Sequence, residues 1–151
     1  MKFKKPDKDQ LEGMLTMILG ADAEAAESKG VDDASIGFTA TYIDDDGVNA
    51  ATCCCSLATA AALGCALSMI PPGGAEGMVE DKELTATATD NLYEVMNIFS
   101  SLMMNDKSAH LKLATVDAGS ESRQTGEGFE EQAFSITLGK YGKGDLVFNH
   151  R

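Results

Sequence analysis

The sequence has 151 residues, of which 44% are hydrophobic and 24% charged, as expected for a globular protein with one domain over residues 1–151. Its net charge of −12 disfavours nucleic acid and anionic membranes as partners, because both attract basic patches, and the only basic cluster is "MKFKKPDK" at the start. A small cationic ligand, a metal ion or a protein partner is compatible with this charge.

The first ten residues, "MKFKKPDKDQ", are charged but lack the apolar stretch of a signal peptide, so we expect a cytoplasmic protein. A helix is then predicted from Asp7 or Asp9 to a C-cap at Gly20. Its apolar residues recur at the spacing of one helical face: Leu11, Met14, Leu15, Ile18 and Leu19. The polar connection "ADAEAAESKGVDDA" can extend a helix only as far as Gly30.

Two strands joined by a hairpin are predicted next. The segment "SIGFTATYI" alternates apolar residues with threonines, and the following "DDDGVNAAT" contains the Asp-Gly pair typical of hairpin turns. The second strand should run from about Val48 through the cysteines. The three aspartates do not follow the ligand pattern of a calcium loop, so we expect a solvated turn.

Residues 50–70, "AATCCCSLATAAALGCALSMI", carry no charge and are long enough to span a membrane. Alanine, serine, threonine and glycine fill most of the segment, however, and these residues insert weakly. We therefore predict a strand that runs into a buried helix over 57–70. Pro71 and Pro72 should end this helix, and "PPGGAEG" should form a loop.

Three of the four cysteines, Cys53, Cys54 and Cys55, are consecutive, which is not a zinc-ligand spacing, and no histidine lies nearby in sequence. Free cysteine is among the most buried residue types, so we expect these residues in the core. A redox or metal protein built on this run is the alternative. A redox sensor would require an exposed thiol with a low pKa.

The longest periodic segment predicts a helix from Glu80 to Asn105. Its apolar stripe consists of Leu92, Val95, Met96, Phe99, Leu102 and Met103. At 100° per residue, the polar residues Asp90, Glu94, Asn97 and Ser101 cluster within about 60° on the opposite side. Such stripes are usually only solvated. Asn97 is unusual there, because an asparagine inside a helix competes for backbone hydrogen bonds.

The rest of the chain predicts a strand in "HLKLATVDAG", a mobile loop in "SESRQTGEGFEEQ", and a strand, glycine-rich turn and final strand in "AFSITLGKYGKGDLVFNH". Consecutive strands joined by short turns favour an antiparallel sheet. We therefore predict an α+β fold with long helices packed on one face of the sheet. The closing strand "DLVFNH" is expected at a sheet edge.

The segment "DNLYEVMNIFSSLM" resembles the signature helix of the CheC/CheX/FliY chemotaxis phosphatases, in which an acidic or small polar residue, a glutamate and an asparagine have this spacing. The order of the other elements is also similar, so the resemblance covers most of the chain, although only the helix motif is specific. The chain resembles the CheX branch, which has one such helix, more than CheC, which has two. In the first predicted helix, Glu12 is followed by Leu15 where a second site would need an asparagine. The chain departs from the family's usual Gly-Asn pair, having Ser101 and Leu102, and it lacks a proline on the next strand.

This resemblance implies a CheC-like fold and a phosphatase acting on the phospho-aspartate of a CheY-like response regulator. Asn97 would orient the attacking water, Glu94 would pair with the receiver's lysine, and Asp90 and Ser101 would flank the contact. The chain would bind no cofactor, because the receiver domain carries Mg²⁺, and it would form a homodimer through joined sheets. The alternative is a non-catalytic module that binds a receiver or another protein.

Overall fold

A six-stranded antiparallel sheet organises the part of the chain that the computed structural model describes, residues 3–20 and 22–151. The first two residues of the basic cluster lie outside this part. The strands are β1 (Glu24–Ser28), β2 (Phe38–Ile43), β3 (Asn49–Cys55), β4 (Lys112–Ala118), β5 (Glu130–Thr137) and β6 (Lys143–His150). They lie in the order β1-β5-β6-β3-β2-β4.

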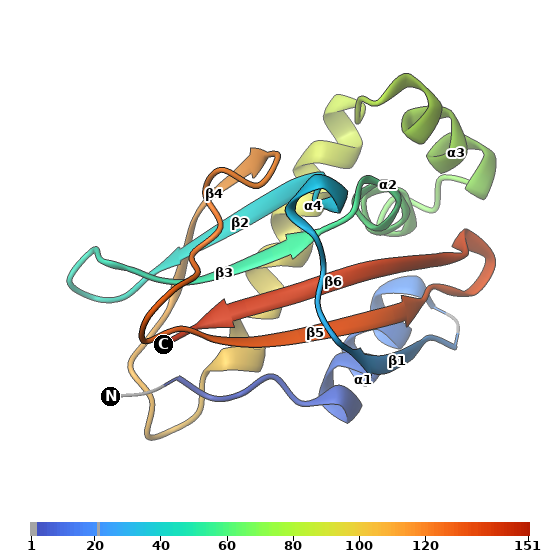
Figure 1. Cartoon of the computed structure of the whole chain (residues 1–151). Helices are drawn as coiled ribbons and strands as arrows, with labels where there is room; N and C mark the ends of the chain where they lie inside the picture. Colours follow the sequence, from blue (N-terminus) through green and yellow to red (C-terminus); the bar gives the residue numbers. More distant parts are fainter. Residues whose placement is uncertain (1–2, 21) are drawn as a thin grey trace.

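The α-helices are α1 (Lys8–Leu19), α2 (Leu57–Ala66), α3 (Pro72–Asp81) and α4 (Ala86–Phe99). Short 3₁₀ turns add η1 (Asp33–Ser35), η2 (Ser100–Met103) and η3 (Gly139–Tyr141). Figure 1 shows α1, α2 and α4 behind the sheet, on one of its faces. The predicted α+β class and the placement of the helices are therefore confirmed.

The main core lies between the sheet and this helix layer. The rings of Phe99 on α4 and Phe134 on β5 each pack edge-on against Phe148 of β6, with ring centroids 6.2 Å apart. Cys53 and Cys55 point into this core, whereas Cys54 belongs to a small apolar cluster on the opposite face of the sheet. The predicted burial of the cysteines is confirmed.

The predictions for the first helix and the first hairpin are confirmed. Helix α1 ends at Leu19, and its C-cap is Gly20 as predicted, with a left-handed φ of 66°. The turn between β2 and β3 is held by Asp44, whose Oδ1 accepts hydrogen bonds from the backbone N–H groups of Asp46 (2.9 Å) and Val48 (3.0 Å). This arrangement is a turn stabilised by its own aspartate.

Four predicted elements differ from the structure. The connection after α1 contains β1, which pairs with β5, and not a helical extension. The expected loop "PPGGAEG" begins α3, because Pro72 occupies a first-turn position and Ala75 and Met78 are buried. The long helix is divided, since Lys82 ends α3 in a left-handed conformation. Helix α2 ends at Ala66 and not at residue 70.

The closing strand was expected at a sheet edge, and this is wrong. Strand β6 lies in the interior of the sheet between β5 and β3, with registered partners on both sides. The edges are β1 and β4. Its Leu146, Val147 and Phe148 are fully buried, as expected for a strand covered on both faces in the middle of the sheet.

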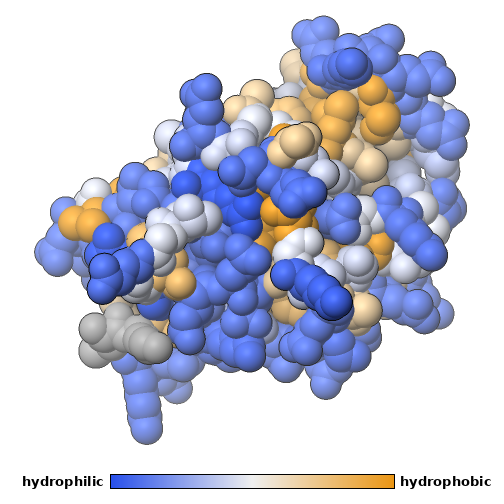
Figure 2. Space-filling view, viewed as in Figure 1, coloured by the Kyte–Doolittle hydropathy of each residue, from blue (hydrophilic) through white to orange (hydrophobic). Residues whose placement is uncertain are grey.

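The loop that was expected to be mobile is tied to the sheet by Arg123, whose side chain is only 8% exposed. Its guanidinium donates to Asn149 Oδ1 (3.0 Å), Val31 O (3.1 Å), Asp33 Oδ1 (2.8 Å) and Glu131 Oε1 (2.7 Å). These bonds join the 29–37 connection, which crosses the near face of the sheet in Figure 1, to β5 and β6. In Figure 2 this near face is largely hydrophilic.

Candidate functional site

The candidate site lies on α4, whose two ends are fixed by side chains. The hydroxyl of the N-cap Thr85 accepts a hydrogen bond from Ala88 N (3.2 Å), which satisfies one of the free N–H groups of the first turn. At the other end, Ser100 Oγ donates to Asn97 O (2.7 Å) and Ser101 Oγ donates to Ile98 O (3.0 Å). These two bonds lie where α4 passes into η2.

The inner face of α4 is pinned to the sheet by Tyr42 of β2. The backbone N–H of Ser100 bonds to Asn97 O and Ile98 O, so the carbonyl of Met96 lacks its ordinary helical donor. The buried Tyr42 hydroxyl donates to this carbonyl at 2.6 Å. Because a buried carbonyl without a partner is costly, this bond fixes the last turn of α4 in place.

The flank of α4 is held against α2 by Asn91. Its Nδ2 donates to Gly64 O (2.8 Å) and to Ser68 Oγ (2.7 Å). The two helices touch so closely that a Cβ on Gly64 would lie 2.6 Å from Ala88 O. Helix α4 is therefore fixed in its position against α2 and in its rotation about its own axis, and this determines the directions of its outward side chains.

The outward face of α4 is defined here as Asp90, Glu94 and Asn97 together with Ser101, which follows in η2, and all four residues are exposed. The side chains of Asp90, Glu94 and Asn97 have no hydrogen-bond or ion-pair partner among the described residues, whereas the Ser101 hydroxyl is used within η2. Glu94 and Asn97 are separated by about 4.5 Å along the helix axis. A rigid helix thus presents a free carboxylate and a free amide side by side.

Two residues of this region were not singled out from the sequence. Asn91, like Asn97, lies within the helix, where asparagine is unfavourable because it competes for backbone hydrogen bonds. The amide of Asn91 has a structural partner, the carbonyl of Gly64. A single exposed aromatic residue such as Tyr93 gives no periodic signal in the sequence. Its side chain is 45% exposed beside the outward face.

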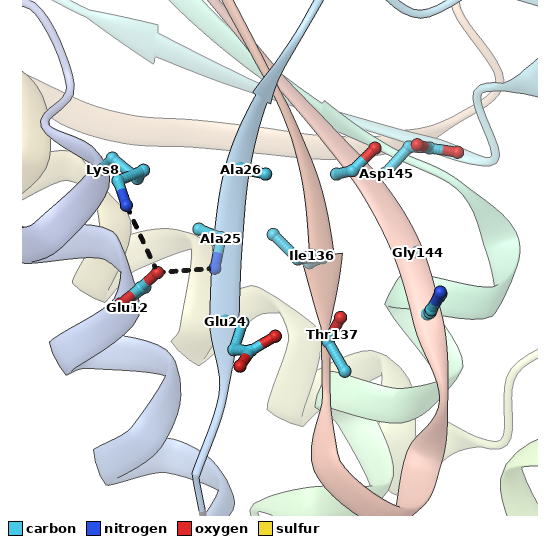
Figure 3. A pocket seen from close by; sticks show the side chains of 11 residues that line it. Lys8, Glu12, Glu24, Ala25, Ala26, Ile136, Thr137, Gly144 and Asp145 are labelled. Carbon is cyan, nitrogen blue, oxygen red and sulfur yellow. Dashed lines mark hydrogen bonds and ion pairs between the residues drawn. The ribbon is translucent and has the colours of Figure 1, made fainter.

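The first helix offers no second copy of the motif. Glu12 Oε2 accepts a hydrogen bond from Ala25 N of β1 (2.9 Å) and lies 3.8 Å from Lys8 Nζ, while Leu15 is fully buried. Glu12 lines a pocket of about 740 Å³ with residues of β1, β5 and β6, as Figure 3 shows. None of the outward residues of α4 lines this pocket, so the two features are separate.

The cysteine run does not have the properties of a redox sensor. All four cysteines are free and buried. Burial raises the pKa of the Cys53 thiol well above its usual value, and it raises the pKa of the Cys54 thiol despite the Thr39 hydrogen bond that lowers it. A reactive thiol needs the opposite shift. Among the described residues, no group of three histidine, cysteine, aspartate or glutamate side chains could hold a metal ion.

No helix in the described part of the chain has the length and apolar character needed to cross a membrane. The segment for which a span was considered forms β3 and α2 instead, as predicted.

No protein-family model matches the sequence, and neither does any curated protein. Several solved structures share the fold. FliM from H. pylori, solved in complex with SpeE, has a TM-score of 0.64 at 9% identity, covering 95% of this chain and 80% of that one. The FliM middle domain from H. pylori has a TM-score of 0.62 at 9% identity, covering 95% of this chain and 84% of that one. FliY from Thermotoga maritima has a TM-score of 0.57 at 14% identity, covering 95% of this chain and 88% of that one. The chain therefore has the CheC-like fold of FliM middle domains and FliY.

Proposed function

We propose that this protein is a phosphatase of the CheX type, which removes the phosphoryl group from the aspartate of a CheY-like response regulator. The observation that supports this function is the pair of unpartnered side chains, Glu94 and Asn97, one turn apart on a helix that Asn91 and Tyr42 fix in place. The sequence resemblance to the CheC/CheX/FliY signature helix falls on this same pair.

The proposed chemistry requires little from the protein beyond position and charge. Phosphoryl transfer has a loose transition state, so a catalyst gains most by holding the attacking water in line with the phosphorus. The amide of Asn97 accepts a hydrogen bond from that water through its oxygen and can donate to a phosphoryl oxygen through its NH₂ group. The receiver supplies the Mg²⁺, and no cofactor of this chain takes part.

The charge of α4 also supports binding to a receiver domain. Helix α4 carries Asp90 and Glu94 and no basic residue, so its outward face suits a partner that presents a positive group. In the proposal Glu94 pairs with a lysine beside the receiver's phosphoryl site and sets the register of the two proteins. Asp90 and Ser101 flank this contact. Such a pathway operates in the cytoplasm.

A non-catalytic module that binds a receiver or another protein is the second candidate. It is favoured by the use of this fold in a complex between two proteins, FliM and SpeE of H. pylori. Ser101 and Leu102 also stand where the chemotaxis phosphatases usually have a Gly-Asn pair. In this case the outward face of α4 would bind a partner without turnover.

The proposal includes a homodimer with joined sheets, and β4 is the strand that we assign to the contact. Within residues 3–20 and 22–151, the strand that pairs with β4 is β2, so the other edge of β4 offers unpaired N–H and C=O groups to a second copy. Strand β1 is less suited, because Glu12 already accepts the hydrogen bond of Ala25 N at that edge. Ala114 is the extra residue at the irregularity in the β2–β4 pairing. Sedimentation of Ala114→Pro beside the wild type tests this contact: we expect a dimeric wild type and a monomeric variant, and a variant that stays dimeric would refute the assignment to β4.

The test of function uses a purified phosphorylated receiver with magnesium and follows the loss of the phosphoryl label. We expect the protein to accelerate this loss and the Asn97→Ala variant to lose at least about 100-fold in kcat, in the range of a positioned catalytic group. The variant should fold normally, because the amide has no partner within the described residues.

Glu80→Gln, which changes an exposed acidic residue of α3, is the control and should keep full activity. A wild-type protein that binds the receiver without accelerating the loss of label would instead identify the non-catalytic module. Full activity of Asn97→Ala would refute the catalytic assignment.

A further inference from the structure

We infer that Tyr93 is the binding anchor through which α4 holds the phosphorylated receiver, while Asn97 carries the chemistry; this inference rests on the proposed function. The described residues expose few large hydrophobic side chains: Met17, Val48, Leu67, Met69, Val79 and Tyr93. Tyr93 is the aromatic one among them. Its hydroxyl has no hydrogen-bond partner in the described part of the chain.

The position of Tyr93 on the helix places it beside the proposed catalytic amide. Residues four apart are neighbours on a helical surface, and Tyr93 precedes Asn97 by four. At 100° per residue, Tyr93 lies about 40° to one side of Asn97 and Glu94 about 60° to the other. A partner that receives Asn97 therefore contacts a carboxylate on one side and an aromatic ring on the other.

The surroundings of α4 leave the Tyr93 side open to this partner. The flank that carries Asn91 is closed by α2, because the amide bonds to Gly64 and Ser68. Tyr93 lies on the far side of the outward face from that contact. An approaching receiver can thus cover the ring without displacing α2.

The chemistry of the side chain fits an anchor. Tyrosine buries a large rigid surface and loses little conformational freedom, which is why it is frequent among the residues that dominate binding energy. The acidic groups of α4 provide attraction at a distance, but an exposed ion pair contributes little to affinity by itself. The partner is therefore a receiver that presents an apolar surface next to its lysine and phosphoryl group.

The test measures the phosphatase rate against receiver concentration for Tyr93→Ala, Tyr93→Phe and Asn97→Ala. It also measures equilibrium binding of a receiver activated with beryllofluoride. We expect Tyr93→Ala to raise both KM and Kd about tenfold or more and to leave kcat within about twofold. Tyr93→Phe keeps the ring and should stay within about threefold of wild type in both constants.

Met17→Ala is the matched control, since it removes an exposed hydrophobic side chain from α1. It should leave both constants unchanged. A Tyr93→Ala protein with wild-type KM and Kd overturns the inference, as does a loss confined to kcat. Equal losses in Tyr93→Phe and Tyr93→Ala would overturn the apolar anchor in favour of the hydroxyl.

These outcomes separate the anchor from the proposed function. A wild-type protein that binds the receiver but does not accelerate dephosphorylation removes the phosphatase and leaves the anchor to be decided by Kd alone. A wild-type protein that binds no receiver removes both.

Discussion

The contact between α2 and α4 predicts that Gly64→Ala destabilises the protein, although alanine is the better helix former. A Cβ on Gly64 would lie 2.6 Å from Ala88 O and 2.9 Å from Ala88 Cβ. An ordinary contact begins at 3.4 Å, so α4 would have to move away by about 0.8 Å. The obstacle is helix backbone, which cannot rotate aside as a side chain can.

The magnitude follows from three contributions. Overpacking of this kind costs about 1–3 kcal/mol. Weakening of the Asn91 Nδ2 hydrogen bond to Gly64 O, now 2.8 Å long, costs about 1 kcal/mol more. The helix propensity of alanine returns about 1 kcal/mol. We therefore expect the free energy of unfolding to fall by about 1–3 kcal/mol.

Gly13→Ala provides the matched control in urea unfolding. Gly13 lies within α1, is exposed, and has no atom within 4 Å of the position a Cβ would take. The same substitution there should raise the free energy of unfolding by about 0.5–1 kcal/mol. If Gly64→Ala stabilised the protein as Gly13→Ala does, the close contact that positions α4 would be refuted.

Two further predictions concern the outer face of the sheet and the cysteines. Arg123→Met should lower the free energy of unfolding, measured in urea, by about 2–4 kcal/mol, mainly because the buried Asn149 Oδ1 loses its donor. The ion pairs with the more exposed Asp33 and Glu131 add little. A change below about 0.5 kcal/mol would contradict this role of Arg123. Because burial holds the pKa of the Cys53 thiol above its unfolded value, the unfolded chain loses this proton first as pH rises past about 9, and the contribution of this thiol to stability should fall there by up to about 1.4 kcal/mol per pH unit. Urea unfolding between pH 7 and 10 measures this slope, which should be shallower in Cys53→Ala, and equal slopes in the two proteins would show that the thiol is not involved.

Local patterns in the sequence were enough to predict several elements. The spacing of apolar residues and the terminal glycine predict α1, and the Asp-Gly pair predicts the hairpin, because each depends on neighbours a few residues away. The polar stripe of α4 is predicted for the same reason, since helical geometry alone brings Asp90, Glu94 and Asn97 to one side.

Other features depended on contacts that no local pattern contains. Strand β1 has the composition of a helix, "EAAES", and becomes a strand because the free edge of β5 and the carboxylate of Glu12 take up its backbone groups. Helix α3 contains three glycines and forms because Ala75 and Met78 can be buried. Strand β6 is central because β3 and β5 pair with it on both sides.

The sequence by itself determined the α+β class, the buried cysteines and the polar face of one helix, because these follow from periodicity and composition over short stretches. Only the tertiary structure decided that Asn91 is a structural amide while Asn97 is free, and that Arg123 holds a long loop against the sheet. Gly64, which accepts from Asn91, is 27 residues away in the chain, and Asn149, which accepts from Arg123, is 26 residues away. Their hydrogen bonds form only once the helices and strands have packed together.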